Sequence, residues 1–230
     1  MEIKIILVKA FTTDKSLGNP AGVILNADHL TDIQMQDIAS ELNFSESVFV
    51  LNSEKTDYRM RYFSPIKEVD FCAHATVDAC YVISSVESIE TGTGILKVDV
   101  NKNSGLVTLW QKKPVFGATV DKSLIAPLLG IAVDNISSEA PCQIVSTDVP
   151  KLIIPVRSLE ILLSMQPNLE DIKQFCVDSG ARGFYPFTTE VFIADSHFHA
   201  RQFNPLAGID EDPNNRHCCW SIRSILGASA

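Results

Sequence analysis

The stretch Asn43-Phe44-Ser45-Glu46-Ser47-Val48-Phe49-Val50 places a carboxylate at the start of an apolar strand. The apolar run that follows Glu46 is typical of a buried β-strand. Burial raises the pKa of a carboxyl group, which suits a general acid or base working near neutral pH. An edge-strand charge that points to water is the more common explanation of such a pattern. Both interpretations stay open at this point.

Short strand-like runs on both sides of this stretch predict an α+β fold. Asn101-Lys102-Asn103-Ser104-Gly105 separates two of them by a hairpin-length loop, which implies antiparallel pairing. Gly18-Asn19-Pro20-Ala21-Gly22 is predicted to be a turn. The predicted strands are 3–10, 23–25, 47–51, 58–63, 96–100, 106–110, 142–146, 151–156, 184–188, 190–195 and 198–203.

Helix signals lie between these runs. Thr31 followed by Gln34 is the signature of a capping box. Ile33, Ile38 and Leu42 are expected to fall on one face of that helix. Further helices are predicted from about residue 74, at 122–129 and at 169–178. The stretch 114–117 is the expected junction between an N-terminal lobe, 1–113, and a C-terminal lobe, 114–230.

The composition of the 230 residues excludes several classes of protein. Hydrophobic residues make up 46% and charged residues 20%, as in ordinary globular proteins. The net charge of −9 argues against nucleic acid or anionic lipid as a partner. No run approaches about 18 apolar residues, so no membrane span is expected. The six cysteines lack Cys-x-x-Cys spacing, which favours a reduced, cytoplasmic chain.

Cys72-Ala73-His74-Ala75-Thr76 lies where an apolar run meets a predicted helix. Free backbone N–H groups at a helix start can bind a carboxylate. His74 could also share a proton with a nearby acid. A histidine that only caps the helix is the commoner outcome for this local pattern, so the sequence leaves both roles open.

Three further motifs carry weaker signals. Asp210-Glu211-Asp212-Pro213 is an acidic turn of a common surface type. His197 and His199 share a strand face, but no strong third ligand lies near them in sequence, so we expect no metal. Adjacent Cys218 and Cys219 rarely form a disulfide because its geometry is strained. They nevertheless leave a thiol-redox protein as a third hypothesis.

Six segments follow one another in a recognisable order. They are Gly18-Asn19-Pro20-Ala21-Gly22-Val23, Met35-Gln36-Asp37-Ile38-Ala39, Asn43-Phe44-Ser45-Glu46-Ser47-Val48-Phe49-Val50, Arg61-Tyr62-Phe63-Ser64-Pro65, Glu68-Val69-Asp70-Phe71-Cys72-Ala73-His74-Ala75-Thr76 and Gly208-Ile209-Asp210-Glu211-Asp212-Pro213. This ordered set resembles the PhzF-type phenazine-biosynthesis-like family, which has the diaminopimelate epimerase-like fold. The resemblance therefore implies two similar α+β lobes, each a rolled antiparallel sheet around a central helix, with the site in the cleft between them.

The resemblance implies roles for particular residues. Glu46 matches the catalytic acid/base of the family, and His74 and Asp212 match the groups that assist it. The implied reaction moves a proton between two carbons of a dihydro-hydroxyanthranilate or another small cyclic carboxylate, with no metal and no organic cofactor. The residues expected to bind the substrate are Asn19, Ala73, Ala75 and Thr76.

Ala73 replaces a glycine that is usual in this family. Its methyl group is expected to narrow the pocket, or to strain the loop if its φ is positive. Related epimerases use two cysteines as their acid/base pair, and the first would fall at Ala73. Because alanine has no proton to exchange, a two-thiol mechanism is disfavoured.

The resemblance ends after Pro213. The family continues with Thr-Gly-Ser-Ala, whereas this chain reads Asn214-Asn215-Arg216-His217-Cys218-Cys219-Trp220 and stops at Ala230. We hypothesise a one-nucleotide frame shift, which sequencing of the gene would test. Loss of the family's terminal strands would expose a sheet edge through which two copies could pair as a homodimer. It also leaves an alternative function: a catalytically impaired member that only binds small molecules.

Overall fold

The computed structural model describes residues 3–12, 18–192 and 196–212. The chain divides into two compact units, Met1–Lys112 and Lys113–Ala230. The boundary expected from the sequence lies one residue further along. Within the described residues, no helix combines the length and the apolar character needed to cross a membrane.

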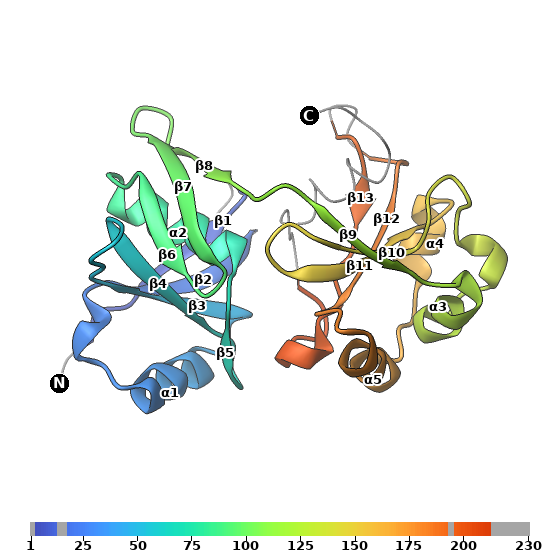
Figure 1. The fold of residues 1–230 in the computed structure, drawn as a ribbon, viewed down its shortest axis with the longest axis horizontal. Coiled ribbons are helices and arrows are strands. Elements are labelled where there is room, and N and C mark those ends of the chain that lie inside the picture. The colour runs from blue at the N-terminus through green and yellow to red at the C-terminus, as the bar shows by residue number, and fades with distance from the viewer. Residues whose placement is uncertain (1–2, 13–17, 193–195, 213–230) are drawn as a thin grey trace. The chain divides into compact units, whose positions relative to one another are not determined.

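The first unit is an eight-stranded sheet that curls around helix α2, Ala73–Ile83 (Figure 1). The strand order is β1-β2-β3-β4-β6-β7-β8, and β5 pairs with β4. Helix α2 contacts β1, β2, β3, β7 and β8, so it is the central helix of this unit. The strands are β1 (Ile6–Ala10), β2 (Asn19–Ile24), β3 (Glu46–Leu51), β4 (Tyr58–Phe63), β5 (Glu68–Val69), β6 (Ser88–Thr91), β7 (Gly94–Asn101) and β8 (Leu106–Trp110).

The predicted turn at 18–22 is mostly strand. Only Gly18, with φ +92°, has turn geometry that favours glycine. Strand β2 begins at Asn19 and pairs antiparallel with β1 and parallel with β3. Pro20 lies opposite Lys9. The Gly-Pro signal was therefore misleading here, because pairing on both sides overrides the turn preference of these residues.

Helix α1, Asp32–Leu42, has the predicted capping box. The Thr31 hydroxyl accepts a hydrogen bond from the Gln34 amide at 3.3 Å, and the Gln34 side chain accepts one from the Thr31 amide at 2.9 Å. Its buried residues are Met35 and Ala39. Ile33, expected on one apolar face with Ile38 and Leu42, is 74% exposed and does not pack inward.

The second unit is a five-stranded sheet with helices packed on one face. The strand order is β13-β12-β11-β10-β9. Side chains from the helices and from alternate strand positions form its larger core, whereas Val145, Ile153, Tyr185 and Phe187 cluster on their own. The elements are β9 (Val115–Thr119), α3 (Lys122–Leu129), β10 (Gln143–Ser146), β11 (Pro150–Pro155), α4 (Leu159–Ser164), α5 (Leu169–Ser179), β12 (Phe184–Thr188) and β13 (His199–Ala200).

The α+β class is confirmed, but the sheets are mixed and not purely antiparallel. Three neighbouring pairs are parallel: β2 with β3, β4 with β6, and β11 with β12. A helix lies in the connection of each pair: α1 in the first, α2 in the second, and α4 and α5 in the third. Parallel neighbours need such crossovers, since a short hairpin loop can join only antiparallel strands.

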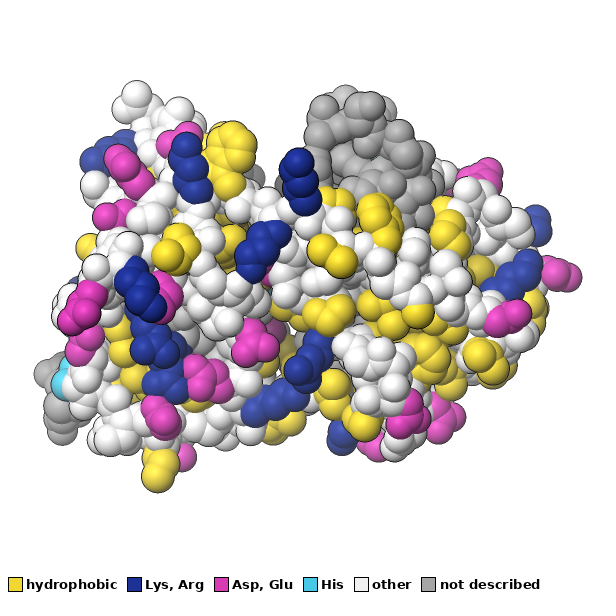
Figure 2. All heavy atoms as spheres, viewed as in Figure 1, with side chains coloured by type: hydrophobic (Ala, Val, Ile, Leu, Met, Phe, Trp, Pro, Cys, Tyr) yellow, Lys and Arg dark blue, Asp and Glu magenta, His cyan; other side chains and the backbone are white. Residues whose placement is uncertain are grey.

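Some boundaries in the second unit also differ from the sequence prediction. Helix α4 and strand β9 were not predicted. The described part of the expected strand 190–195 contains no strand, and 193–195 lie outside the described residues. The expected strand 198–203 is reduced to β13 and an isolated bridge between Phe184 and Phe203. Figure 2 shows basic and acidic side chains interspersed on the visible face of each unit.

Candidate active site

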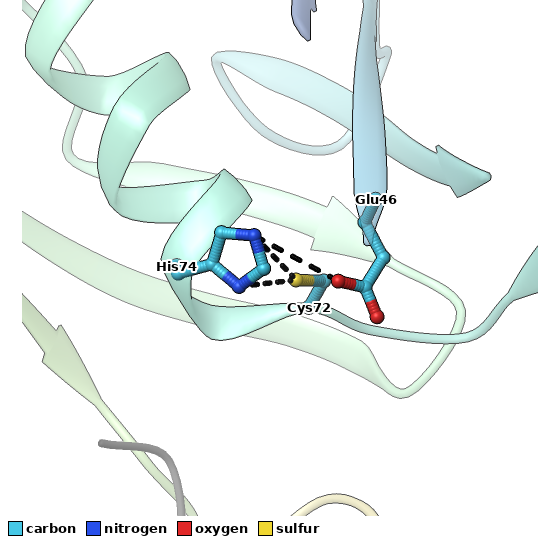
Figure 3. A group of neighbouring side chains, drawn as sticks. All are labelled: Glu46, Cys72 and His74. Atoms are coloured by element: carbon cyan, nitrogen blue, oxygen red, sulfur yellow. Dashed lines mark hydrogen bonds and ion pairs between the residues drawn. The ribbon is translucent and has the colours of Figure 1, made fainter. Parts of the chain in front are cut away.

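Glu46, Cys72 and His74 meet inside the first unit (Figure 3). Glu46 is the first residue of β3, and Cys72 and His74 lie at the start of α2, which packs against β3. Their exposed fractions are 5%, 7% and 2%, so all three are buried. The edge-strand alternative for Glu46 is therefore wrong, because both β2 and β4 pair with β3.

The three side chains converge on a small volume. Nε2 of His74 lies 3.7 Å from Oε2 of Glu46. The sulfur of Cys72 lies 3.2 Å from Nδ1 and 3.9 Å from Nε2 of the same ring. Sequence reasoning paired an acid with His74 but did not place the Cys72 thiol beside the ring. Cys72 is the extended N-cap of α2 and His74 lies in the first turn, so the sulfur meets the ring across this helix start.

The contacts of Asn19 and Ser45 favour one tautomer of the neutral His74 ring. The Asn19 amide nitrogen lies 3.2 Å from Nδ1, and an amide N–H can only donate, so Nδ1 accepts. The neutral ring then carries its hydrogen on Nε2, the nitrogen nearer Glu46. The Ser45 hydroxyl donates to the Asn19 carbonyl oxygen at 3.3 Å, and its oxygen lies 3.5 Å from Nε2. The resemblance implies a substrate-binding role for Asn19, and in the structure its side chain contacts the catalytic candidate His74.

The start of α2 has no side-chain cap. Its N-cap, Cys72, makes no capping hydrogen bond through its side chain, and the first turn holds no acidic residue. The first amides of a helix have no carbonyl partner within that helix, and the positive end of the dipole lies there. Ala73 and Ala75 supply two of these amides. Ala73 is absent from the non-glycine residues with positive φ, so the condition for backbone strain at this position is not met.

Thr76 is engaged by its surroundings. Its amide and its hydroxyl both donate to the Cys72 carbonyl, at 3.0 and 2.7 Å. The buried Tyr62 hydroxyl lies 2.7 Å from the Thr76 hydroxyl oxygen and donates to it. Burial raises the pKa of Tyr62 well above its usual value, so this phenol keeps its proton. Thr76 thus shapes the turn that presents Ala73 and His74.

Asp212 lies in the second unit and is 4% exposed. The Gln202 side-chain amide donates to Oδ2 of Asp212 at 3.2 Å, and the Asp212 amide donates to the Gln202 carbonyl at 3.0 Å. Gln202 gave no signal in the sequence, because a single glutamine in an irregular segment matches no motif. The participation of Asp212 in the same site as Glu46 remains a prediction.

The other sequence candidates are less informative. His199 belongs to β13 and packs its ring against Phe192 with centroids 5.6 Å apart, while His197 precedes the strand. Among the described residues, the three-member group with metal-ligand chemistry is Glu46, Cys72 and His74, which no sequence spacing suggested. Cys218 and Cys219, and the rest of 213–230, lie outside the described residues.

Comparison with known proteins gives the class. Residues 8–216 match the family model for phenazine biosynthesis-like proteins. An uncharacterized isomerase of Clostridium acetobutylicum is 38% identical over 90% of this chain and 73% of its own length. An uncharacterized isomerase of Bacillus subtilis is 35% identical over 92% of this chain and 76% of its own. By family and fold, the chain is an isomerase or epimerase.

Solved structures agree with this classification. A Bacillus anthracis phenazine biosynthesis protein of the PhzF family has a TM-score of 0.82 and 33% identity, covering 99% of this chain and 79% of its own. A predicted epimerase of Pseudomonas aeruginosa has a TM-score of 0.73 at 20% identity, covering 98% and 83%, and shows the same fold. The chain belongs to the phenazine biosynthesis-like family.

Proposed function

We propose that this protein is a cofactor-independent isomerase in which Glu46 moves a proton between two carbons of a small cyclic carboxylate. The observation that carries the proposal is the buried approach of the Glu46 carboxylate to Nε2 of His74, at 3.7 Å. A carboxylate that takes a proton and returns it to another carbon needs no electron acceptor.

The start of α2 supplies the second requirement. A substrate carboxylate that accepts hydrogen bonds from the amides of Ala73 and Ala75 would be held at the positive end of the helix. This anchor would lie next to Glu46 and His74, so the acidic C–H of the substrate would be presented to the carboxylate. Holding the reacting groups in this way supplies much of the rate acceleration that such a site can give.

His74 then has a defined task. Its Nε2–H is directed at the region where the substrate and Glu46 meet, and it stabilises negative charge that develops as the C–H bond breaks. Glu46 holds the abstracted proton and delivers it to the second carbon. Asp212, held by Gln202, is proposed to assist that delivery. A pair of two copies through a sheet edge remains a prediction of the sequence.

The test is isotope exchange in heavy water. A panel of cyclohexadiene carboxylic acids would be incubated with the protein, and deuterium at carbon would be measured by NMR. Glu46→Gln should lower the exchange rate at least 10³-fold, because the amide cannot accept the proton, while circular dichroism shows an intact fold. The matched control is Glu41→Gln, an exposed carboxylate on α1. Full exchange by Glu46→Gln would refute the role of Glu46.

A catalytically impaired binding protein is the second candidate. It is favoured by Ala73, whose methyl group stands where the family has glycine. Calorimetric titration with the same acids separates the two functions. Binding without deuterium incorporation supports the binding protein, and Ala73→Gly should then restore exchange if the methyl group is the cause.

A further inference from the structure

The group formed by Glu46, Cys72 and His74 has a donor set that the proposed proton transfer does not fully use. It offers one carboxylate oxygen, one thiol sulfur and one imidazole nitrogen, all within 4.8 Å of one another. Proton transfer requires the first and the last of these. The Cys72 sulfur has no part in that chemistry, yet it lies against the ring (Figure 3).

The spacing of these donors is close to that of a tetrahedral zinc site. Zinc bond lengths of roughly 2.0 to 2.3 Å separate oxygen and nitrogen ligands by about 3.4 Å, and nitrogen and sulfur ligands by about 3.6 Å. The observed Nε2 to Oε2 distance is 3.7 Å and the Nε2 to Sγ distance is 3.9 Å. Because the sulfur lies nearer Nδ1, at 3.2 Å, the Cys72 side chain must also turn toward the lone-pair side of Nε2. That rotation, together with a contraction of a few tenths of an ångström between Nε2 and Oε2, would bring three ligands around one cation and leave the fourth position to water.

The electrostatics also favour a dication. A thiolate and a carboxylate together neutralise two positive charges, so the buried complex carries no net charge. Cys72 stands at the start of α2, where the positive end of the helix stabilises a negative ligand. Its soft sulfur and the imidazole select zinc-like cations over magnesium or calcium, which prefer oxygen ligands.

The other thiols among the described residues are Cys80, Cys142 and Cys176. Burial raises the pKa of Cys80 to about 12 and the pKa values of Cys142 and Cys176 to about 11 each. They therefore stay protonated, and a protonated thiol is a poor ligand. None of these three cysteines belongs to the group formed by Glu46, Cys72 and His74.

We propose that Glu46, Cys72 and His74 bind a thiophilic divalent cation, represented by Zn²⁺, and that the bound cation blocks proton transfer. Binding replaces the thiol proton of Cys72 by the metal and releases that proton to solvent. The ring hydrogen moves from Nε2 to Nδ1, and the Asn19 amide turns so that its carbonyl accepts it. With Glu46 already ionised, one proton leaves for each cation bound. The inhibitory part rests on the proposed function; the binding part does not.

The experiment uses the full chain with Cys218→Ser and Cys219→Ser, so that these thiols cannot bind metal. Zn²⁺ affinity is measured by competition with a chromophoric chelator, and Co²⁺ is added as a spectroscopic probe whose thiolate charge-transfer band reports a bound sulfur. We expect one equivalent bound, release of about one proton in weak buffer, and a Co²⁺ band. Cys72→Ala should abolish the band and lower Zn²⁺ affinity about 100-fold. Its matched control, Cys80→Ala on the same helix, should change neither.

Unchanged affinity and an unchanged band in Cys72→Ala would overturn the site, and Cys72→Ser provides the same test if the alanine variant does not fold. Binding at Cys72 with undiminished deuterium exchange would overturn the inhibition. If the metal-free chain exchanges no substrate of the panel, the proposed function fails, while the Co²⁺ band still decides whether the cation site exists.

Discussion

Helices α1 and α2 belong to the same unit and have 11 residues each, yet they begin in opposite ways. At α1 the Thr31 side chain caps the first turn, and Asp32 places a negative charge there. At α2 the N-cap is Cys72, whose side chain makes no capping bond, and no acidic residue follows in the first turn. The start of α1 is therefore capped and charge-compensated, whereas the start of α2 has neither a side-chain cap nor a compensating charge.

The other described α-helices resemble α1. Asp121, Ser158 and Asn168 cap α3, α4 and α5 through their side chains. A capping side chain contributes about 1 kcal/mol to stability. The absence of that stabilisation at α2 therefore coincides with the place where amides and a histidine lie beside a buried carboxylate. The side-chain cap that stabilises the other helices is thus missing at the helix start that the proposed function uses to bind a carboxylate.

The buried residues of α1 and α2 also differ in polarity. Helix α1 buries Met35 and Ala39, which are ordinary core residues. Helix α2 buries His74, Thr76 and Asp78. Buried polar groups cost free energy unless they are paired. The following predictions test this contrast, from the largest expected effect to the smallest.

Asp78→Asn should remove a pH-dependent instability. Burial raises the pKa of Asp78 from 3.8 to about 8, and no hydrogen bond reaches its Oδ2 from the described residues. Between these two pH values the folded state holds a proton that the unfolded chain has released. The contribution of protonated Asp78 to the free energy of unfolding is therefore fully present below about pH 4. It falls by about 1.4 kcal/mol per pH unit as the pH rises from about 4 through 8, and it is lost above that.

The measurement is urea unfolding at pH 5 and pH 8. The difference in unfolding free energy between these pH values should shrink by roughly 3 to 4 kcal/mol in Asp78→Asn, because the amide does not ionise. Asp99→Asn, at an exposed position on β7, is the control and should keep the parent profile. An unchanged pH profile in Asp78→Asn would show that Asp78 is ionised in the folded protein.

Asn19→Asp should impair proton transfer about 100-fold with the backbone fold preserved. The carboxylate accepts where the amide donated, so it draws the ring hydrogen of His74 from Nε2 to Nδ1. Nitrogen-15 NMR of the imidazole should show this change of tautomer, which a loss of packing alone would not produce. Asn103→Asp, in an exposed turn, is the control. The same tautomer in both variants would argue against the positioning role of Asn19.

Ala73→Pro removes a single amide at the first position of α2, where proline fits the backbone. Cys72, with φ −140° and ψ 114°, already has the extended conformation that a following proline requires. The KM for a carboxylate substrate should rise about tenfold, with little change in thermal stability. Lys122→Pro, at the same position of α3, is the matched control and should leave KM unchanged. Equal KM values would exclude the amide as an anchor.

Thr31→Ala should show the converse behaviour at α1. Loss of the capping hydroxyl should lower the unfolding free energy by about 1 kcal/mol, as measured by urea denaturation. Deuterium exchange at saturating substrate should stay within twofold of the parent. A large loss of deuterium exchange would show that the start of α1 affects the site at the start of α2.

Local sequence signals predicted the parts of the fold that depend on near neighbours. The capping box at Thr31, the hairpin around residues 101–105, and the helix that ends before Gly130 all agree with the structure. Ile33 was misplaced because periodicity shows that a helix has an apolar face but not which side packs inward. The parallel pairs were missed because pairing depends on the path of whole crossovers.

For the candidate site, the sequence by itself determined that Glu46 starts an apolar strand and that His74 stands at a helix start, since both facts depend only on adjacent residues. The tertiary structure decided that these two meet, that Cys72 joins them, and that Asn19 sets the protonation of the ring. Those contacts link residues up to 55 positions apart. They exist because β3 and α2 pack together inside one curled sheet, and no local pattern encodes a distance between segments that only the folded chain brings together.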